Sequence, residues 1–152
     1  MQTTAHVEDY ASAPADGLRM LFHRDDGTAM PFQVQLHQVV RSTTSAPWSN
    51  DTVIAIPGVD PATYPMGCPT ISPDGNRLFF STTLFSPTDG DVYYSERASA
   101  SAAWSTPVRI DTVSSPGQHD CPDAISRDGC ELYTHRFSHD GTGGATLLVS
   151  HR

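Results

Sequence analysis

The sequence contains no lysine and only three glutamates. Nine arginines stand against fourteen aspartates and those three glutamates, so the 152-residue chain has a formal net charge of −8. A surface of this sign is repelled by phosphate backbones and anionic lipids. No apolar run approaches the roughly 20 residues needed to cross a bilayer. We therefore expect neither nucleic acid nor membrane insertion among the interactions of this protein.

The composition also disfavours long helices. Aspartate, serine and threonine are abundant, and they are joined by 11 glycines and 12 prolines. These residue types favour turns and short strands over helices. The length is that of one ordinary domain, large enough to bury a core without disulfides or a metal. The composition thus predicts one all-β domain over residues 1–152.

The chain repeats itself with a long period. Asp-Gly occurs six times in three pairs, and the first members of the pairs, at Asp16, Asp74 and Asp128, lie 58 and 54 residues apart. Trp48-Ser49 and Trp104-Ser105 keep the same phase at a separation of 56 residues. Two markers in phase indicate a repeated structural unit.

The middle copy predicts a unit of four short strands. Its strands are expected at 69–72, 77–82, 91–97 and 107–111, and the first two are joined by the turn sequence Ser-Pro-Asp-Gly. The three units are expected at about 9–57, 68–111 and 121–152. The third copy lacks a fourth strand, and residues 1–8 are a weak candidate for that missing outer strand.

Two stretches of the middle copy resemble a known repeat. Ile71-Ser72-Pro73-Asp74-Gly75-Asn76-Arg77-Leu78-Phe79-Phe80, followed by Asp91-Val92-Tyr93-Tyr94, is similar to the TolB-type, WD-repeat-like β-propeller repeat. The third copy has Arg127 in place of the turn proline, and the first copy departs further, with an extra residue expected in its turn. The resemblance implies a partial propeller of about three blades. Propellers of this type serve as binding scaffolds, as accessory domains of peptidases and, less often, as enzymes.

Three blades do not close a ring, because propellers typically use four to eight. An open stack exposes a strand edge and an apolar blade face. Two arrangements remain open: the chain is part of a longer propeller, or two copies form a six-bladed homodimeric ring in which one N-terminus completes the other's last blade.

The three cysteines are expected to be free thiols. Cys68 and Cys121 each precede proline at the start of an inner strand, in neighbouring copies. Inner strands of adjacent blades are expected to lie beyond the roughly 7 Å between Cα atoms that a disulfide tolerates. Cys130 lies at the opposite end of its strand from Cys121, so that pair is not expected either.

The candidate ligand site lies on the loop face, which the loops entering the inner strands share with the loops between second and third strands. The expected ligand-binding residues there are Tyr64, Met66, Cys68, His119, Asp120 and Asp123. His119, Asp120 and His139 are weak candidates for a divalent metal, because imidazole and carboxylate suit such ions but the spacing matches no known motif. No catalytic residue is assigned. His119, Asp120 and Cys121 offer a base, an orienting group and a nucleophile, but adjacent residues on a strand point to opposite faces.

The sequence favours a non-enzymatic module that binds a peptide, a protein or a glycan. The alternative is a metal-assisted lyase or hydrolase acting on an acidic saccharide. No cofactor is assigned beyond the possible metal. The resemblance implies an extracytoplasmic location, periplasmic or secreted, although free thiols would argue mildly against an oxidising compartment.

Overall fold

Antiparallel strands make up all the regular secondary structure of the computed structural model, which describes residues 7–25, 34–84, 89–138 and 144–151. The predicted all-β class is confirmed. The strands are β1 (Val7–Ser12), β2 (Arg19–Asp25), β3 (Val34–Val40), β4 (Ser49–Val53), β5 (Met66–Ile71), β6 (Arg77–Thr82), β7 (Asp91–Glu96), β8 (Val108–Arg109), β9 (Gln118–Ile125), β10 (Glu131–Ser138) and β11 (Thr146–His151).

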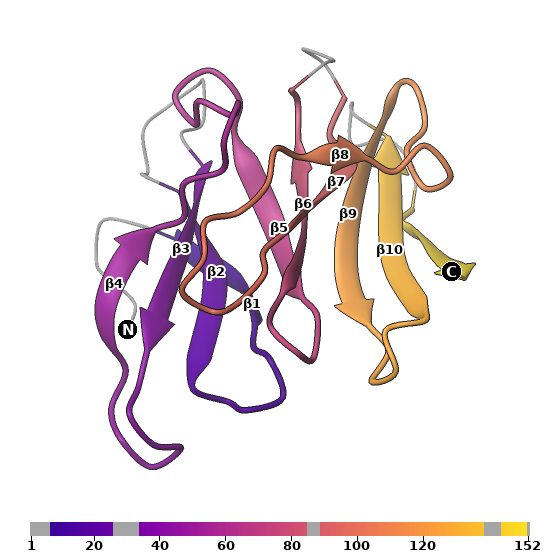
Figure 1. The fold of residues 1–152 in the computed structure, drawn as a ribbon. Coiled ribbons are helices and arrows are strands. Elements are labelled where there is room, and N and C mark those ends of the chain that lie inside the picture. Colours follow the sequence, from indigo (N-terminus) through magenta and orange to yellow (C-terminus); the bar gives the residue numbers. More distant parts are fainter. Residues whose placement is uncertain (1–6, 26–33, 85–88, 139–143, 152) are drawn as a thin grey trace.

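The strands form three sheets that stand side by side like blades (Figure 1). Blade 1 has the order β1-β2-β3-β4, blade 2 the order β5-β6-β7-β8, and blade 3 the order β9-β10-β11. Sheets of four, four and three strands are consistent with part of a propeller. The tight turns after β1, β5 and β9 lie at the bottom of Figure 1, and we call this end the turn face. The opposite end, where the chain enters β5 and β9, is the loop face.

The Asp-Gly turns have one architecture, which explains their recurrence. In blade 2 the Asp74 carboxylate accepts hydrogen bonds from the Ser72 hydroxyl at 2.5 Å and from the Asn76 backbone N–H at 3.1 Å. Gly75 takes a φ of 74°, a left-handed conformation that glycine adopts without a steric penalty. Asp128 and Ser126 repeat the pattern in blade 3, where the side chains lie 2.6 Å apart.

Blade 1 uses the same turn length. The Gly17 N–H donates to the Pro14 carbonyl at 3.0 Å, just as the Gly75 N–H donates to Ser72. The expectation of an extra residue inside this turn was therefore wrong. Pro14 simply occupies the serine position, and the aspartate cap survives, since the Leu18 N–H donates to Asp16 at 2.9 Å.

An arginine, a tryptophan and a glycine form a brace at the outer part of blades 1 and 2. In blade 2 the Arg97 guanidinium lies 4.2 Å from the ring centre of Trp104 and donates to the Gly75 carbonyl. In blade 1, Arg41 lies 4.2 Å from the ring centre of Trp48 and donates to the Gly17 carbonyl at 2.7 Å. The in-phase tryptophans thus tie the fourth strand to the turn of their own blade, as packing rather than as a ligand site.

Each blade packs one face against the next. Between blades 1 and 2 the core contains buried side chains such as Leu21, Leu36 and Phe80, with Trp104 at its edge. A smaller core between blades 2 and 3 contains Phe79, Val92, Val113 and Leu132. Strand residues of blade 2 thus alternate between two cores, as the two-residue period of a strand dictates.

The N-terminal strand completes its own blade. β1 pairs with β2, with Asp9 opposite His23, and therefore supplies the innermost strand of blade 1. The proposed outer strand from residues 1–8 is contradicted over Val7 and Glu8, while residues 1–6 lie outside the described part of the chain.

The prediction of three free thiols was wrong for two of them. Cys68 and Cys121 form a disulfide between blades 2 and 3, with their Cα atoms 5.7 Å apart, whereas Cys130 is free and exposed. The error came from treating the inner strands as regular. β5 has a bulge between Gly67 and Thr70, and Cys68 within it takes a φ of 52°. The bulge brings Cys68 within bonding distance of the neighbouring blade.

Candidate functional site

A pocket opens on the loop face where the inner strands of the three blades meet; we call it the axial pocket. Its volume is about 250 Å³, and the aromatic and imidazole rings of Tyr10, His23, His119 and Phe137 line it together with the Cys68–Cys121 disulfide. These side chains come from β1, β2, β9, β10 and β5, so all three blades contribute.

The rings form a continuous series around the axial pocket. Tyr10 contacts His23, with ring centres 5.0 Å apart, and faces His135 at 6.3 Å. On the other side, Phe137 lies between His135 at 5.6 Å and His119 at 5.2 Å, nearly parallel to both. Stacked rings present flat π faces, which accept other rings and cations.

Two local backbone features position these rings. Tyr10 takes a φ of 53° in a bulge of β1 between Asp9 and Ser12, the same conformation that Cys68 takes in β5. Gly90 has no side chain where one would collide, because a Cβ there would lie 2.2 Å from Nδ1 of His119. The Asp89-Gly90 pair therefore serves close approach to an imidazole rather than a left-handed turn.

The electrostatic environment of the pocket is negative. Burial raises the pKa of the Tyr10 phenol, and the carboxylates of Asp9 and Asp123 raise it further. Burial lowers the pKa of His23, although Asp9 and Asp25 oppose this shift. The Cys68 backbone N–H donates to Nδ1 of His23 at 3.4 Å, which requires that nitrogen to be unprotonated. His23 is therefore neutral at pH 7, and no arginine lines the described part of the pocket.

The predicted site residues separate into two groups. Cys68 and His119 line the axial pocket. Met66 is 1% exposed in the core between blades 1 and 2, and Tyr64 packs against the same core. Tyr64 precedes β5 and Met66 is its first residue, but the side chains of both face the interior. The structure therefore does not bring them to the axial pocket.

The acidic candidates have structural partners. Asp120 is fully buried and accepts a hydrogen bond from Arg136 at 2.6 Å and another from the Ser115 N–H at 2.8 Å. Asp123 lies in the bulge of β9, 2.8 Å from Nδ1 of His135. The described residues contain no group of three metal-ligating side chains, and His139, the third metal candidate, lies outside the described residues.

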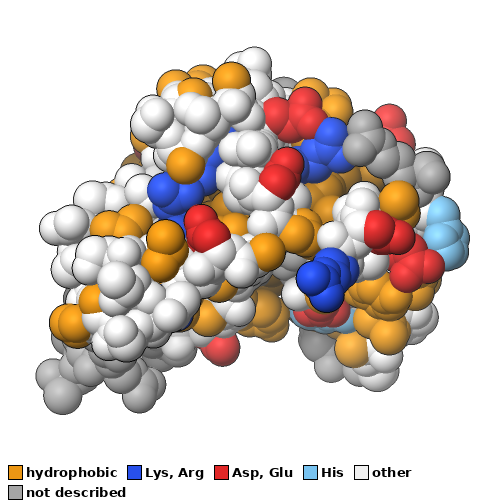
Figure 2. Space-filling view, turned by 60° about the horizontal axis from the view of Figure 1, so that its bottom comes forward, with side chains coloured by type: hydrophobic (Ala, Val, Ile, Leu, Met, Phe, Trp, Pro, Cys, Tyr) orange, Lys and Arg blue, Asp and Glu red, His pale blue; other side chains and the backbone are white. Residues whose placement is uncertain are grey.

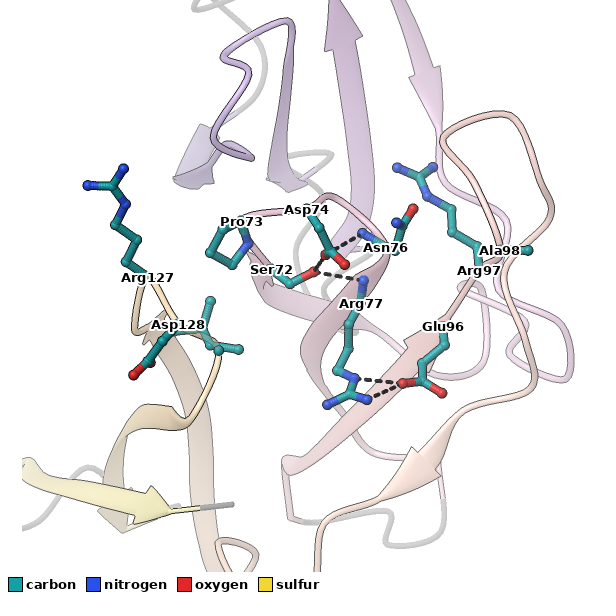
Figure 3. Close-up of a pocket in the computed structure, with 12 residues that line it drawn as sticks. Ser72, Pro73, Asp74, Asn76, Arg77, Glu96, Arg97, Ala98, Arg127 and Asp128 are labelled. Carbon is teal, nitrogen blue, oxygen red and sulfur yellow. Dashed lines mark hydrogen bonds and ion pairs between the residues drawn. The ribbon is translucent and has the colours of Figure 1, made fainter.

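A larger cleft lies on the turn face between blades 2 and 3. It has a volume of about 650 Å³ and is lined by charged and polar side chains, several of which Figure 3 labels. Figure 2, which brings this end forward, shows charges of both signs interspersed there. Arg77 pairs with Glu96, and Asp74 caps its own turn (Figure 3). Most of these charges therefore have structural partners; among the described residues Arg127 forms no ion pair.

Sequence reasoning missed Tyr10, His23 and Phe137. A signal for Tyr10 was present, because it precedes Asp16 by six residues, as Cys68 precedes Asp74. His23 and His135 also share one repeat position, each four residues after the start of the second strand. Phe137 has no such signal, since only the pairing of Phe137 with His119 in the sheet places it beside the pocket.

Comparisons with known proteins add little to this picture. No protein-family model matches the chain, and no curated protein matches it. Two solved structures are similar over 97% of this chain at 12% identity: a prolyl endopeptidase, with a TM-score of 0.40, and prolyl oligopeptidase B from Galerina marginata, with a TM-score of 0.36. The chain spans 27% and 29% of those chains. At such scores the likeness carries no argument about function.

There is also no helix among the described residues that is long and apolar enough to cross a membrane.

Proposed function

We propose that this protein is a non-enzymatic binding module of the TolB type that binds a peptide. A cationic side chain of the peptide enters the axial pocket. The observation that carries the proposal is the series of ring faces in a negative environment. Tyr10 and Phe137 supply aromatic faces, while Asp9, Asp25 and Asp123 supply the negative potential. An arginine or lysine side chain is attracted by both.

The lining favours a peptide over a glycan. Apart from the imidazoles, the hydrogen-bonding side chains that line the described part of the pocket are Tyr10, Ser81, Thr82 and Thr83, and Ser81 and Thr82 are buried. A sugar ring would leave many hydroxyls without partners there, at a cost of about 1–3 kcal/mol for each group buried without a partner. A methylene stem ending in a charge has no such requirement, because the stem packs on the rings and the charge remains near the carboxylates.

A peptide array tests this proposal against a glycan array probed in parallel. We expect saturable binding to peptides that contain arginine or lysine, and loss of that binding when the cation is replaced by glutamate. Tyr10→Ala should weaken binding about tenfold, since one cation–π contact contributes roughly 1–2 kcal/mol. Tyr10→Phe keeps the ring and should bind almost as the parent does.

Arg127→Ala is the matched control, because Arg127 is exposed and lines the turn-face cleft. This variant should bind normally. Binding that is lost in Arg127→Ala but kept in Tyr10→Ala would place the site at the turn face and refute the proposal. Binding to glycans alone would refute the choice of ligand.

The disulfide supports an extracytoplasmic location for this module. A bond that joins two blades persists in an oxidising compartment, whereas cytosolic reductants keep thiols reduced. The mild argument from free thiols against such a compartment no longer applies to Cys68 and Cys121. Thiol titration of protein purified directly from its source organism tests the proposal: one reactive thiol, from Cys130, is expected, and three would contradict it.

A further inference from the structure

We infer that the axial pocket selects arginine over lysine, and that the Thr82 hydroxyl accepts a hydrogen bond from the guanidinium of the bound arginine. The inference rests on the proposed function and narrows its ligand from any cationic side chain to one. Two features of the described pocket carry it: a buried hydroxyl without a partner, and a set of flat, nearly parallel rings.

The Thr82 hydroxyl is an unsatisfied polar group in the wall of the axial pocket. Thr82 is 2% exposed and lines the pocket, and its Oγ1 atom forms no hydrogen bond in the described structure. A buried hydroxyl without a partner lowers stability, so native proteins contain few of them. A ligand group that donates to Oγ1 would supply the missing partner.

The equivalent position in the other two blades, five residues after the start of the second strand, is an arginine. Arg24 in β2 donates to Glu8 at 3.1 Å, and Arg136 in β10 donates to Asp120 at 2.6 Å. In each case the carboxylate stands opposite the arginine on the inner strand of the same blade. The blade architecture therefore accommodates a guanidinium at this end of the second strand.

Blade 2 lacks both members of this pair. Thr82 holds the arginine position in β6, and Met66 stands opposite it in place of the carboxylate. No arginine of the chain lines the described part of the axial pocket. A guanidinium that comes from a ligand thus meets no competing cation of the chain there.

The rings of the axial pocket suit a planar cation. Phe137 is nearly parallel to His119, with an interplanar angle of 6°, and to His135, with an angle of 16°. A guanidinium is planar and weakly hydrated, and it stacks on such faces while its N–H groups point outward in its own plane. The volume of about 250 Å³ is at the small end for ligand pockets, so one side chain contacts several walls at once. The face of a guanidinium can thus lie on a ring while its edge donates to Thr82.

The same lining suits a lysine ammonium poorly. An ammonium is a compact, strongly hydrated charge with three donors and no flat face. Asp9, Asp25 and Asp123 attract it at a distance, but none of them lines the described part of the pocket. Nδ1 of His23 already accepts the Cys68 N–H. An ammonium that enters would exchange its hydration for few acceptors, so it should bind more weakly than a guanidinium.

The test compares three peptides by isothermal titration calorimetry with the whole protein. Their sequence is Gly-Gly-X-Gly-Gly with blocked ends, and X is arginine, lysine or citrulline, which has the shape of arginine without its charge. We expect the arginine peptide to bind roughly tenfold more tightly than the other two. Equal binding of arginine and lysine would overturn this inference and leave the proposed function standing. Absence of binding by both would overturn the proposed function, and this inference with it.

Thr82→Val removes the hydroxyl and keeps the approximate shape of the side chain. It should weaken binding of the arginine peptide about tenfold, because a hydrogen bond to a charged group is lost. Without ligand, the variant should unfold at a higher urea concentration than the parent, since the unpaired hydroxyl is gone. Thr82→Ser keeps the hydroxyl and should bind as the parent does.

Thr134→Val is the matched control. Thr134 is fully buried in β10, its hydroxyl also has no partner in the described structure, and it does not line the axial pocket. This variant should gain stability as Thr82→Val does and should bind the arginine peptide as the parent does. Unchanged binding in Thr82→Val, or an equal loss of binding in Thr134→Val, would overturn the inference.

Discussion

Removal of the Cys68–Cys121 disulfide should cost a large part of the stability of this protein. The bond closes a loop with a sequence separation of 53 residues, between the inner strands of two blades. Closing a loop of that length removes chain entropy from the unfolded state, and the stabilisation it gives is about 4 kcal/mol. Domains of this size are stable by roughly 5–15 kcal/mol, so the bond accounts for a quarter or more of the total.

The double variant Cys68→Ala/Cys121→Ala is compared with the parent in urea, with and without a reductant. We expect the free energy of unfolding to fall by about 4 kcal/mol and the midpoint of thermal unfolding to fall by about 10 °C. Reductant should destabilise the parent by a similar amount and should leave the double variant unchanged. Cys130→Ser, which removes the exposed free thiol, should unfold like the parent and keep its sensitivity to reductant.

One result would refute this reasoning directly. If the parent has three titratable thiols when unfolded without reductant, or if its urea midpoint is indifferent to reductant, the two cysteines are not bonded. The bulge at Cys68 would then have no stabilising role, and the axial pocket would lose the bond that holds blades 2 and 3 together beside it.

Three further predictions concern single side chains. Gly90→Ala should displace His119 and lower stability by about 1–3 kcal/mol, because the new Cβ would overlap the imidazole. Gly144→Ala is the control in urea unfolding, since a Cβ at Gly144 would have no described atom within 4 Å. Arg97→Ala should lower the free energy of unfolding by about 2 kcal/mol, and Arg41→Ala should lower it by less, because Trp104 is buried whereas Trp48 is half-buried. Equal losses of stability in urea unfolding would contradict this prediction. His23 has a lowered pKa when folded, so its neutral form stabilises the fold above about pH 6.5 and this contribution is lost as the pH falls through the folded pKa. Urea midpoints measured between pH 7 and pH 5 should therefore decline in the parent more steeply than in His23→Gln.

The architecture could be predicted from the sequence because the repeated residues make their contacts within a single turn or blade. Ser72, Asp74 and Gly75 satisfy one another within a single turn, so their pattern has the same meaning wherever it recurs. The in-phase tryptophans Trp48 and Trp104 also predicted the repeat, because each packs in the same way against the arginine of its own blade. Both predictions depended on contacts within one blade.

The site could be predicted only in part, because its contacts join different blades. Cys68 and Cys121 both precede proline and looked equivalent, but Cys121 pairs directly with His135 while Cys68 lies in a bulge. A one-residue bulge leaves no mark in composition or period, yet it decides which neighbour a side chain meets. The position of Met66 at the entrance of β5 likewise does not indicate which face its side chain takes, and the structure places it in the core between blades 1 and 2.

A comparison of equivalent positions in the three blades distinguishes residues that the fold requires from residues that line the axial pocket. Where the copies agree, as at Asp16, Asp74 and Asp128, the shared residue has a structural role in each blade that could be described. Where they differ at one repeat position, as at His23, Ser81 and His135, the fold does not require a particular side chain. Those differing positions border or line the axial pocket, together with Tyr10 and Cys68, which also share a position. The disulfide stabilises the fold, but the repeated architecture gives no reason for rings at positions where the copies differ, and it is these rings to which our proposal assigns the ligand.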